Sequence, residues 1–285
     1  GEGIFWTAQH IDRTFESEKA PTRKPQTGML TEYFDENKYD LANSFVIGDR
    51  ATDVELAENL GSKSVFIAHE NLVNATFCSM DWEEIYQFLK SSYRSAKVVR
   101  KTNETSIEIY VNLDGTGKHD ISTGIGFFDH MLEQIARHAK IDLKIKVAGD
   151  LHIDDHHTIE DTALALGEAF DKALGDKRGI ERYGCFLLPM DETLAQVALD
   201  FSGRNWLVWD VTFNREKVGD FSTEMTEHFF KSFSDTAKCN LNIQAKGINA
   251  HHLIESIFKG FAKSIKIAKT RDVTNNEIPS TKGVL

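Results

Sequence analysis

The alternation of apolar and polar positions indicates a βαβ unit in the first hundred residues. Residues 43–49 are mostly apolar and end in a Gly-Asp pair, which is typical of a buried strand that stops at a turn. Residues 53–60 have apolar side chains at helical spacing and precede Gly61, a frequent helix stop. Residues 64–67 then predict a second strand parallel to the first, because a helix connects the two.

From residue 97 onward the pattern occurs twice, which indicates an internal duplication. Each half contains alternating segments, such as 106–111 and 143–147, that predict strands. Each half then has a helix with one histidine near its start, a further strand, and a helix that opens with two histidines. The single histidines are His130 and His228, and the pairs are His156-His157 and His251-His252. We expect an α+β domain with sheet on one side, helices on the other, and antiparallel strands.

The chain of 285 residues is long enough for two domains. A helix over 82–90 and a linker over 91–95 separate them, so the expected domains are residues 1–95 and 96–285. No apolar run reaches the roughly 18 residues of a membrane-spanning helix, and no basic-then-apolar leader opens the chain. The first residue is Gly1 rather than Met, which we interpret as a truncated or processed start.

Charge and cysteine content narrow the possible functions. The 33 basic and 44 acidic residues give a net charge of −11, which disfavours nucleic-acid binding because that requires a clustered basic face. Any bound phosphate should therefore be small and held by a few local cations. The three cysteines are scattered without metal-binding spacing, so we expect a reducing cytoplasm and neither a disulfide framework nor a membrane setting.

The histidine pairs have the spacing of metal ligands. Helical residues four positions apart share a face, so His156 with Glu160 and His251 with Glu255 could each chelate one ion. The other histidine of each pair is rotated by about 100° and must serve another ion or none. One symmetric partition gives one metal His156, Glu160, His228 and His252, and the other metal His251, Glu255, His130 and His157. Each site would then take ligands from two subunits.

The ligand types limit the metal without fixing the reaction. Six imidazoles and two carboxylates suit Mn²⁺, Fe²⁺, Co²⁺ or Zn²⁺, and mixed nitrogen and oxygen ligands favour an octahedral ion over closed tetrahedral zinc. Such a site fits a metal-dependent lyase, a two-metal hydrolase or a non-catalytic, metal-stabilised shell. The hydrolase predicts phosphate release from simple monoesters, whereas the shell predicts metal-dependent assembly without turnover.

Residues 46–57, Val-Ile-Gly-Asp-Arg-Ala-Thr-Asp-Val-Glu-Leu-Ala, resemble the last motif of the haloacid-dehalogenase phosphatases. The resemblance implies a Mg²⁺ site at Asp49, with Asp53 as a second carboxylate, and phosphate contact by Lys24. The stretch is similar to the histidinol-phosphatase half of bifunctional bacterial histidine-biosynthesis enzymes. The family's Asp-x-Asp-x-Thr nucleophile motif and its zinc-binding cysteines do not occur here, so we predict a vestigial domain without phosphatase activity.

Residues 97–285 resemble imidazoleglycerol-phosphate dehydratase along nearly their whole length. The resemblance rests on segments such as Thr-Gly-Ile-Gly-Phe-Phe-Asp-His at 123–130, Asp-Asp-His-His-Thr-Ile-Glu-Asp at 154–161 and the Pro-Ser-Thr-Lys-Gly tail at 279–283. It implies two Mn²⁺ ions and active sites between the subunits of a homo-oligomer of twenty-four chains. It also implies duplicated halves of the ribosomal protein S5 domain 2-like fold, preceded by a partial Rossmann-like α/β domain.

The resemblance further implies a set of site residues. Phosphate would be bound by Gln134, Arg178, Arg204, Lys259, Ser280 and Lys282. Asp161 would join this substrate-binding set as an orienting group beside Glu160, with plain solvent exposure as the alternative. The implied reaction dehydrates imidazoleglycerol phosphate to imidazoleacetol phosphate in histidine biosynthesis, with Glu104 as the acid/base and Glu192 as a weaker candidate. We expect Ser280 and Lys282 to close over the substrate, since chain ends are usually mobile.

Overall fold

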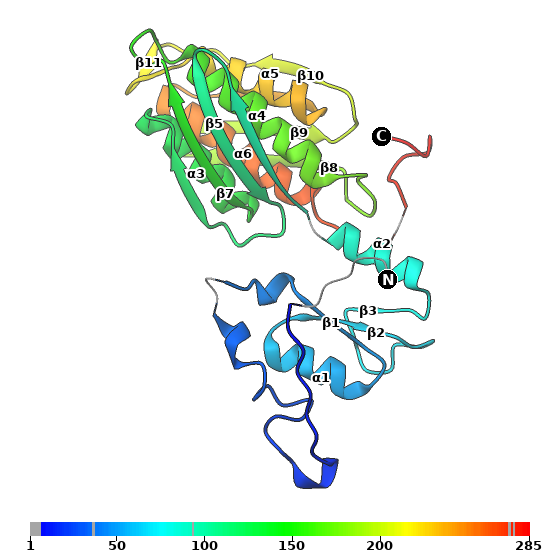
Figure 1. The fold of residues 1–285 in the computed structure, drawn as a ribbon. Coiled ribbons are helices and arrows are strands. Elements are labelled where there is room, and N and C mark those ends of the chain that lie inside the picture. The colour runs from blue at the N-terminus through cyan, green and yellow to red at the C-terminus, as the bar shows by residue number, and fades with distance from the viewer. Residues whose placement is uncertain (1–6, 36–37, 93, 273–274, 276) are drawn as a thin grey trace. The chain divides into compact units, whose positions relative to one another are not determined.

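The computed structural model of the protein describes residues 7–35, 38–92, 94–272, 275 and 277–285 (Figure 1). It contains two compact units, residues 1–93 and 94–285, and each is described by itself. The linker expected over 91–95 is too long, because helix α2 (Trp82–Ser92) continues into it and strand β4 begins at Ser95. Tyr93 lies outside the described residues. In the described part of the chain, no helix combines the length and apolarity needed to cross a membrane.

The first unit contains the predicted βαβ arrangement. Strands β1 (Phe45–Gly48) and β2 (Lys63–Phe66) pair in parallel and are connected by α1 (Ala51–Leu60). Helix α1 ends where Gly61 adopts a left-handed φ of 71°, a conformation that glycine tolerates best. Strand β3 (Phe77–Cys78) adds to β2 in parallel, so the sheet order is β1-β2-β3.

Short 3₁₀ turns and a small core complete the first unit. The turns span Glu16–Glu18, Thr31–Phe34 and Leu41–Asn43. The core is a cluster around the buried Val65, Ile85 and Phe88, against which Phe45 and Phe77 pack. Such a core is much smaller than that of the second unit.

The second unit consists of two halves with the same order of elements. The first half contains β4 (Ser95–Lys101), β5 (Thr105–Asn112), β6 (His119–Ser122), α3 (Gly126–Ala139), β7 (Asp142–Gly149) and α4 (His156–Leu174). The second half contains β8 (Tyr183–Met190), β9 (Thr193–Asp200), β10 (Trp206–Asp210), α5 (Met225–Ala237), β13 (Asn240–Lys246) and α6 (Ala250–Ala268). A small hairpin, β11 (Lys217–Val218) with β12 (Phe221–Ser222), is inserted before α5.

The strand orders β4-β5-β7-β6 and β8-β9-β13-β10 correspond position by position. The expectation of purely antiparallel sheets is wrong at one edge of each, because β6 pairs with β7 and β10 with β13 in parallel. The reason is the helix between the paired strands: a chain that crosses over through α3 or α5 returns in its original direction. The remaining pairs are antiparallel.

The helices of the two halves pack against each other between the sheets. Helix α4 contacts β4, β5 and α5, whereas α6 contacts β8, β9 and α3. Strands β5 and β9 alternate between buried and more exposed residues, as expected when one sheet face covers the helices. The expected arrangement of sheet on one side and helices on the other is therefore wrong, since one core shared by both halves joins all the layers. This packing brings α4 beside α5 and α3 beside α6 (Figure 1).

Candidate functional site

One group of predicted metal ligands lies where α4 meets α5. Helix α4 begins at His156, directly after Asp155, whose carboxylate accepts hydrogen bonds from the backbone and hydroxyl of Ser222. His156 Nε2 lies 3.0 Å from Glu160 Oε2, and His228 Nδ1 on α5 lies 3.7 Å from the same oxygen. These three ligand atoms are within 4.8 Å of one another. The structure thus gathers three of the four ligands assigned to this metal.

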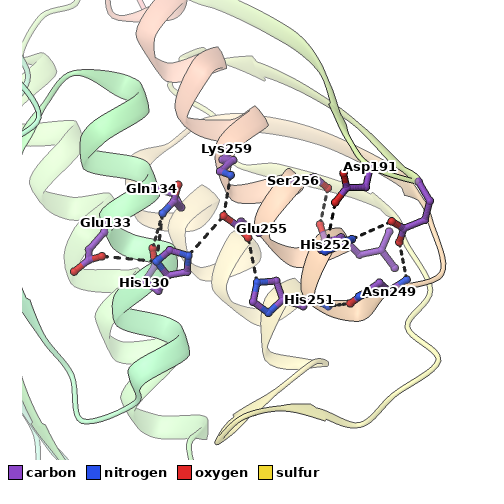
Figure 2. A network of polar contacts seen from close by, with 12 residues as sticks. His130, Glu133, Gln134, Asp191, Asn249, His251, His252, Glu255, Ser256 and Lys259 are labelled. Carbon is purple, nitrogen blue, oxygen red and sulfur yellow. Dashed lines mark hydrogen bonds and ion pairs between the residues drawn. The ribbon is translucent and has the colours of Figure 1, made fainter.

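A second group lies where α3 meets α6 (Figure 2). Asn249 caps α6 by accepting the backbone N–H of His251 at 3.0 Å. His251 Nε2 is 3.1 Å from Glu255 Oε2, and His130 Nε2 is 3.6 Å from Glu255 Oε1. Lys259, one turn further on, lies 2.8 Å from Glu255 Oε1. Burial raises the pKa of Glu255, but the bond and charge of Lys259 more than offset this and leave that pKa below its ordinary value.

Both groups fit a divalent ion by their donors, and the first group also fits by the mutual spacing of its three ligand atoms. In the second group, each histidine faces a different oxygen of Glu255. Each offers two imidazole nitrogens and one carboxylate, which suit a first-row transition ion. Ligand atoms at about 2.1 Å from a metal and at right angles to each other are about 3 Å apart. The separations of 3.0–3.7 Å from the shared glutamate to its histidines match this value within modest side-chain movement.

The remaining histidine of each pair faces a different carboxylate. His157 Nδ1 lies 3.0 Å from Asp150 Oδ2, and His252 Nδ1 lies 2.9 Å from Glu192 Oε2. Each hydrogen bond raises the pKa of the histidine and lowers that of the carboxylate, and the pKa of Glu192 falls to about 2. His157 and His252 are therefore not in the group of their neighbours, and their assignment to metals across a subunit boundary stays a prediction.

Glu104 lies in an open pocket of about 330 Å³ beside the first ligand group. The pocket is lined by Arg100, Thr102, Glu104, His156, His157, Glu160 and Asp161. Glu104 occupies the turn between β4 and β5, and its backbone N–H donates to Thr102 Oγ1 at 3.2 Å. The acid/base candidate and one metal group are thus brought together, although they are more than fifty residues apart in sequence.

Asp161 anchors this turn to α4. Its Oδ1 accepts hydrogen bonds from Arg100, whose Nε is at 3.0 Å, and its Oδ2 accepts the Thr105 hydroxyl at 2.5 Å. Only 15% of the Asp161 side chain is exposed, so the alternative of plain solvent exposure is wrong. The arrangement matches the orienting role, and direct contact with substrate stays a prediction. Arg100 was not among the site residues predicted from the sequence, because no local pattern indicates its pairing with Asp161, sixty-one positions away.

The predicted phosphate-binding residues fall into separate places. Gln134 lies beside the second ligand group, with its Nε2 3.4 Å from His130 Nδ1 and its Oε1 3.2 Å from His138 Nε2. Lys259 lies in that group too, through its contact with Glu255. Neither residue is among those that line the pocket of Glu104.

The other phosphate candidates lie on loops and on the tail. Arg178 Nε donates to Asp176 at 3.1 Å, and Arg204 is exposed in the loop after β9. Ser280 and Lys282 belong to a tail whose last residue lies against Gly203, next to Arg204. Backbone bonds also tie the tail to the loop after α4, because Gly179 N donates to Glu277 O at 2.9 Å. The tail thus has a docked position in the structure, and its closure over substrate stays a prediction.

The phosphatase-like residues form one ion pair in the first unit. Lys24 Nζ lies 2.5 Å from Asp53 Oδ1, and Arg50 N donates to Asp53 Oδ2 at 3.1 Å. Asp53 is buried, with 4% of its surface exposed, whereas Asp49 is exposed. Asp53 rather than Asp49 is therefore the carboxylate next to Lys24.

Comparisons with known proteins agree with both parts of this description. The family model for imidazoleglycerol-phosphate dehydratase matches residues 123–265, and a haloacid-dehalogenase-like hydrolase model matches residues 21–74. The histidine biosynthesis bifunctional protein HisB of Spirosoma linguale is 59% identical over 100% of this chain and 79% of its own length. The HisB protein of Bacteroides fragilis is 55% identical over 100% of this chain and 78% of its own length.

Two solved dehydratase structures resemble the second unit. Imidazoleglycerol-phosphate dehydratase from Staphylococcus aureus has a TM-score of 0.57 and 36% identity, covering 62% of this chain and 99% of that one. The enzyme from Pyrococcus furiosus has a TM-score of 0.58 and 30% identity, covering 66% of this chain and 100% of that one. The sequence-based recognition is confirmed by these matches. This chain belongs to the imidazoleglycerol-phosphate dehydratase family of histidine biosynthesis and is similar over its whole length to the bifunctional HisB proteins.

Proposed function

We propose that this chain dehydrates imidazoleglycerol phosphate to imidazoleacetol phosphate and water. The reaction would use two divalent metal ions, for which we propose Mn²⁺. The observation that carries the proposal is the pair of ligand groups, His156-Glu160-His228 and His130-His251-Glu255, at equivalent helix pairs of a duplicated unit. A storage or shell role would not require the acid/base candidate Glu104 beside one group. The family match supplies the substrate class.

The three ligands of each group would hold one ion, and His252 or His157 of another subunit would complete it. When bound, the ions would act as Lewis acids toward the substrate imidazole and favour its deprotonated form, whose ring electrons can displace the hydroxyl group from the side chain. Sharing of ligands requires a homo-oligomer, for which we propose the shell of twenty-four chains. We further propose the ribosomal protein S5 domain 2-like fold for residues 96–285 and a partial Rossmann-like phosphatase fold for residues 1–95.

Glu104 is the group that we assign to proton transfer. The duplication places Glu104 and Glu192 in equivalent turns, β4–β5 and β8–β9. Both oxygens of Glu192 accept hydrogen bonds, from His252 and from the backbone of Asn249. The Glu104 carboxylate accepts none from the described residues and lines the open pocket. A carboxylate without fixed partners can take up and release a proton, which is what an acid/base group requires.

The phosphate end of the substrate would be held by cations at the edge of the site. Lys259 is already beside the His130-His251-Glu255 group, so it can bind phosphate close to that metal. Arg178, Arg204, Ser280 and Lys282 lie on the tail and the loops that it contacts, and we propose that they enclose the phosphate of a neighbouring subunit's substrate. Asp161 would keep its orienting position on the β4–β5 turn.

For the first unit we propose that residues 1–95 are catalytically inert. Lys24 and Asp53 supply an electrostatic pair for a phosphate or Mg²⁺, but transfer to an aspartate needs the nucleophile motif that these 285 residues do not contain. Histidinol phosphate incubated with the chain and Mg²⁺ should therefore release no phosphate.

The test of the dehydratase is turnover of imidazoleglycerol phosphate by metal-stripped protein with and without added Mn²⁺. Formation of imidazoleacetol phosphate only when Mn²⁺ is present supports the reaction, the substrate and the metal together. Release of phosphate from simple monoesters would instead favour a two-metal hydrolase. Metal-dependent assembly without turnover would favour a structural shell.

A further inference from the structure

We infer that Asp150 and Glu192 are positioning residues, each of which fixes the ring of one outward-facing histidine so that its Nε2 is presented to a metal. The inference rests on the proposed two-metal function. It concerns His157 and His252, the members of the two pairs that do not face the glutamate of their own helix.

Glu192 connects the ring of His252 to the start of its helix. Its Oε2 is 2.9 Å from His252 Nδ1, and its Oε1 accepts the backbone N–H of Asn249 at 3.0 Å. Asn249 in turn caps α6 through His251 N. The same carboxylate therefore fixes both the side chain and the backbone from which it extends. Figure 2 shows His252 on the Asp191 side of α6, away from the ring of His251 next to Glu255.

Asp150 makes the corresponding contact in the first half. It lies directly after β7, and its Oδ2 is 3.0 Å from His157 Nδ1. Its Oδ1 is buried and has no hydrogen-bond partner within the described part of the chain. An oxygen that is shielded from water without a hydrogen-bond partner does not stabilise the fold, so this carboxylate calls for another explanation. The contact of its other oxygen with His157 Nδ1 provides that explanation, since it holds the His157 ring in position.

The two contacts are not copies made by the duplication. Asp150 comes from the β7–α4 connection, seven residues before its histidine, whereas Glu192 comes from the β8–β9 turn, sixty residues before its histidine. The two halves thus reach the same pairing of Nδ1 with a carboxylate through different segments. A common arrangement with different origins indicates a shared requirement on the two rings.

The requirement follows from imidazole chemistry. A neutral imidazole carries one proton, and an Nδ1–H that donates to a carboxylate leaves the Nε2 lone pair available as a ligand. The carboxylate also fixes the ring plane and makes Nε2 a stronger donor. For His252, Asp191 Oδ2 lies 3.8 Å from Nε2 and adds negative charge where a cation would approach.

The test compares Mn²⁺ binding by the full-length variants Asp150→Ala and Glu192→Ala. The matched control is Glu168→Ala, which removes a surface carboxylate paired with Lys172 on α4. Free Mn²⁺ is measured by electron paramagnetic resonance during titration of metal-stripped protein. Side-chain ¹⁵N NMR of the metal-free proteins reports which ring nitrogens carry the protons.

We expect Mn²⁺ affinity to fall about 10–100-fold in each variant, which is the usual effect of losing such a partner, and to stay unchanged in the control. The Mn²⁺ concentration needed for half-maximal turnover should rise accordingly, and the Nδ1–H form of the affected histidine should disappear. If an alanine variant fails to fold, Asp150→Asn and Glu192→Gln replace it in the test, because they preserve side-chain shape. Their Mn²⁺ affinity should lie between those of wild type and the alanine variants.

Unchanged Mn²⁺ affinity in all variants would overturn the inference while leaving the proposed function intact. Lost turnover with intact Mn²⁺ affinity would also overturn it, because the carboxylates would then act in the chemistry itself. If wild-type protein bound no Mn²⁺, both the inference and the proposed function would fall.

Discussion

Glu104 and Glu192 are the same residue type in equivalent turns, yet their neighbours differ. Glu192 is held by His252 and by the backbone of Asn249, which lowers its pKa to about 2. Glu104 faces a pocket next to His156 and has no such partners among the described residues. At the scale of single residues, surroundings rather than residue type distinguish the carboxylate that is held in place from the one that faces the pocket.

The replacement Glu104→Gln should lower kcat by about 100- to 10,000-fold, because it removes the proton carrier and preserves shape. Mn²⁺ affinity should change little, since Glu104 is not among the ligands. Steady-state kinetics at saturating Mn²⁺ provides the measurement. Glu108→Gln is the control, because Glu108 lies nearby on β5 and pairs with Lys97 at 2.7 Å on the surface. A Glu104→Gln protein with full turnover would remove our assignment.

Lys269 should make stability depend on alkaline pH. Its ammonium donates to Leu113 O at 2.5 Å, and burial, followed by the charge of Arg94, lowers its pKa from 10.5 to about 8. Below about pH 8 the lysine is charged in both the folded and the unfolded chain. Between about 8 and 10.5 only the unfolded chain keeps the proton, so the free energy of unfolding rises with pH.

The contribution of Lys269 should be about 2 kcal/mol between about pH 7 and about pH 9.5. Urea unfolding of wild type and of the Lys269→Met variant at the two pH values separates the contribution of Lys269 from those of the other titrating groups. Wild type should gain stability relative to the variant as the pH rises. A constant difference between the two proteins would show that the folded lysine titrates normally.

At the scale of elements, close contact between α4 and α5 sets the geometry of the first ligand group. A Cβ at Gly167 would lie 2.6 Å from the backbone oxygen of Phe233 and would collide with the Thr236 side chain. The Thr236 hydroxyl donates across the same contact to Leu164 O at 2.8 Å. Glycine at this position therefore lets the two helices, and with them His156 and His228, approach each other.

Gly167→Ala should destabilise the protein by about 1–3 kcal/mol, as expected for a forced shift between packed elements. It should also weaken Mn²⁺ binding, since the ligands of one ion lie on both helices. Gly126→Ala is the control, because a Cβ at this helical glycine meets nothing within 4 Å. Thermal unfolding and Mn²⁺ titration of both variants test the claim, which fails if the two behave alike.

At the scale of the whole molecule, the proposed sites cross subunit boundaries. His228 lies with His156 and Glu160, whereas His252 of the same chain faces Glu192. In the proposed partition, one chain thus supplies three ligands to one ion and its His252 to an ion on another chain. This arrangement makes mixed assemblies of inactive variants informative.

Co-expressed His228→Ala and His252→Ala chains should recover about a quarter of wild-type turnover when they mix randomly in a symmetric oligomer. Recovery arises because an intact His228 of one chain meets an intact His252 of another. Mixing His228→Ala with His156→Ala should restore nothing, since both ligands belong to the same chain. Equal turnover in the two mixtures would rule out shared sites.

The sequence by itself determined most of the elements and the set of predicted ligands. Apolar spacing gave the βαβ unit, the repeat gave the two halves, and helical geometry gave the pairs His156-Glu160 and His251-Glu255. These features are local, because a helix brings together residues four positions apart whatever surrounds it. The family resemblance added Glu104 and the cations.

Only the tertiary structure decided the strand directions, the inner layer of helices and the partners of the second histidines. The parallel edges follow from crossovers through α3 and α5. The contacts of Asp161 with Arg100 and of His252 with Glu192 join residues about sixty positions apart. Such pairings depend on how sheets and helices pack, and no local pattern encodes them. For the same physical reason, the side chains around Glu104 and Glu192, rather than the turns themselves, distinguish their roles.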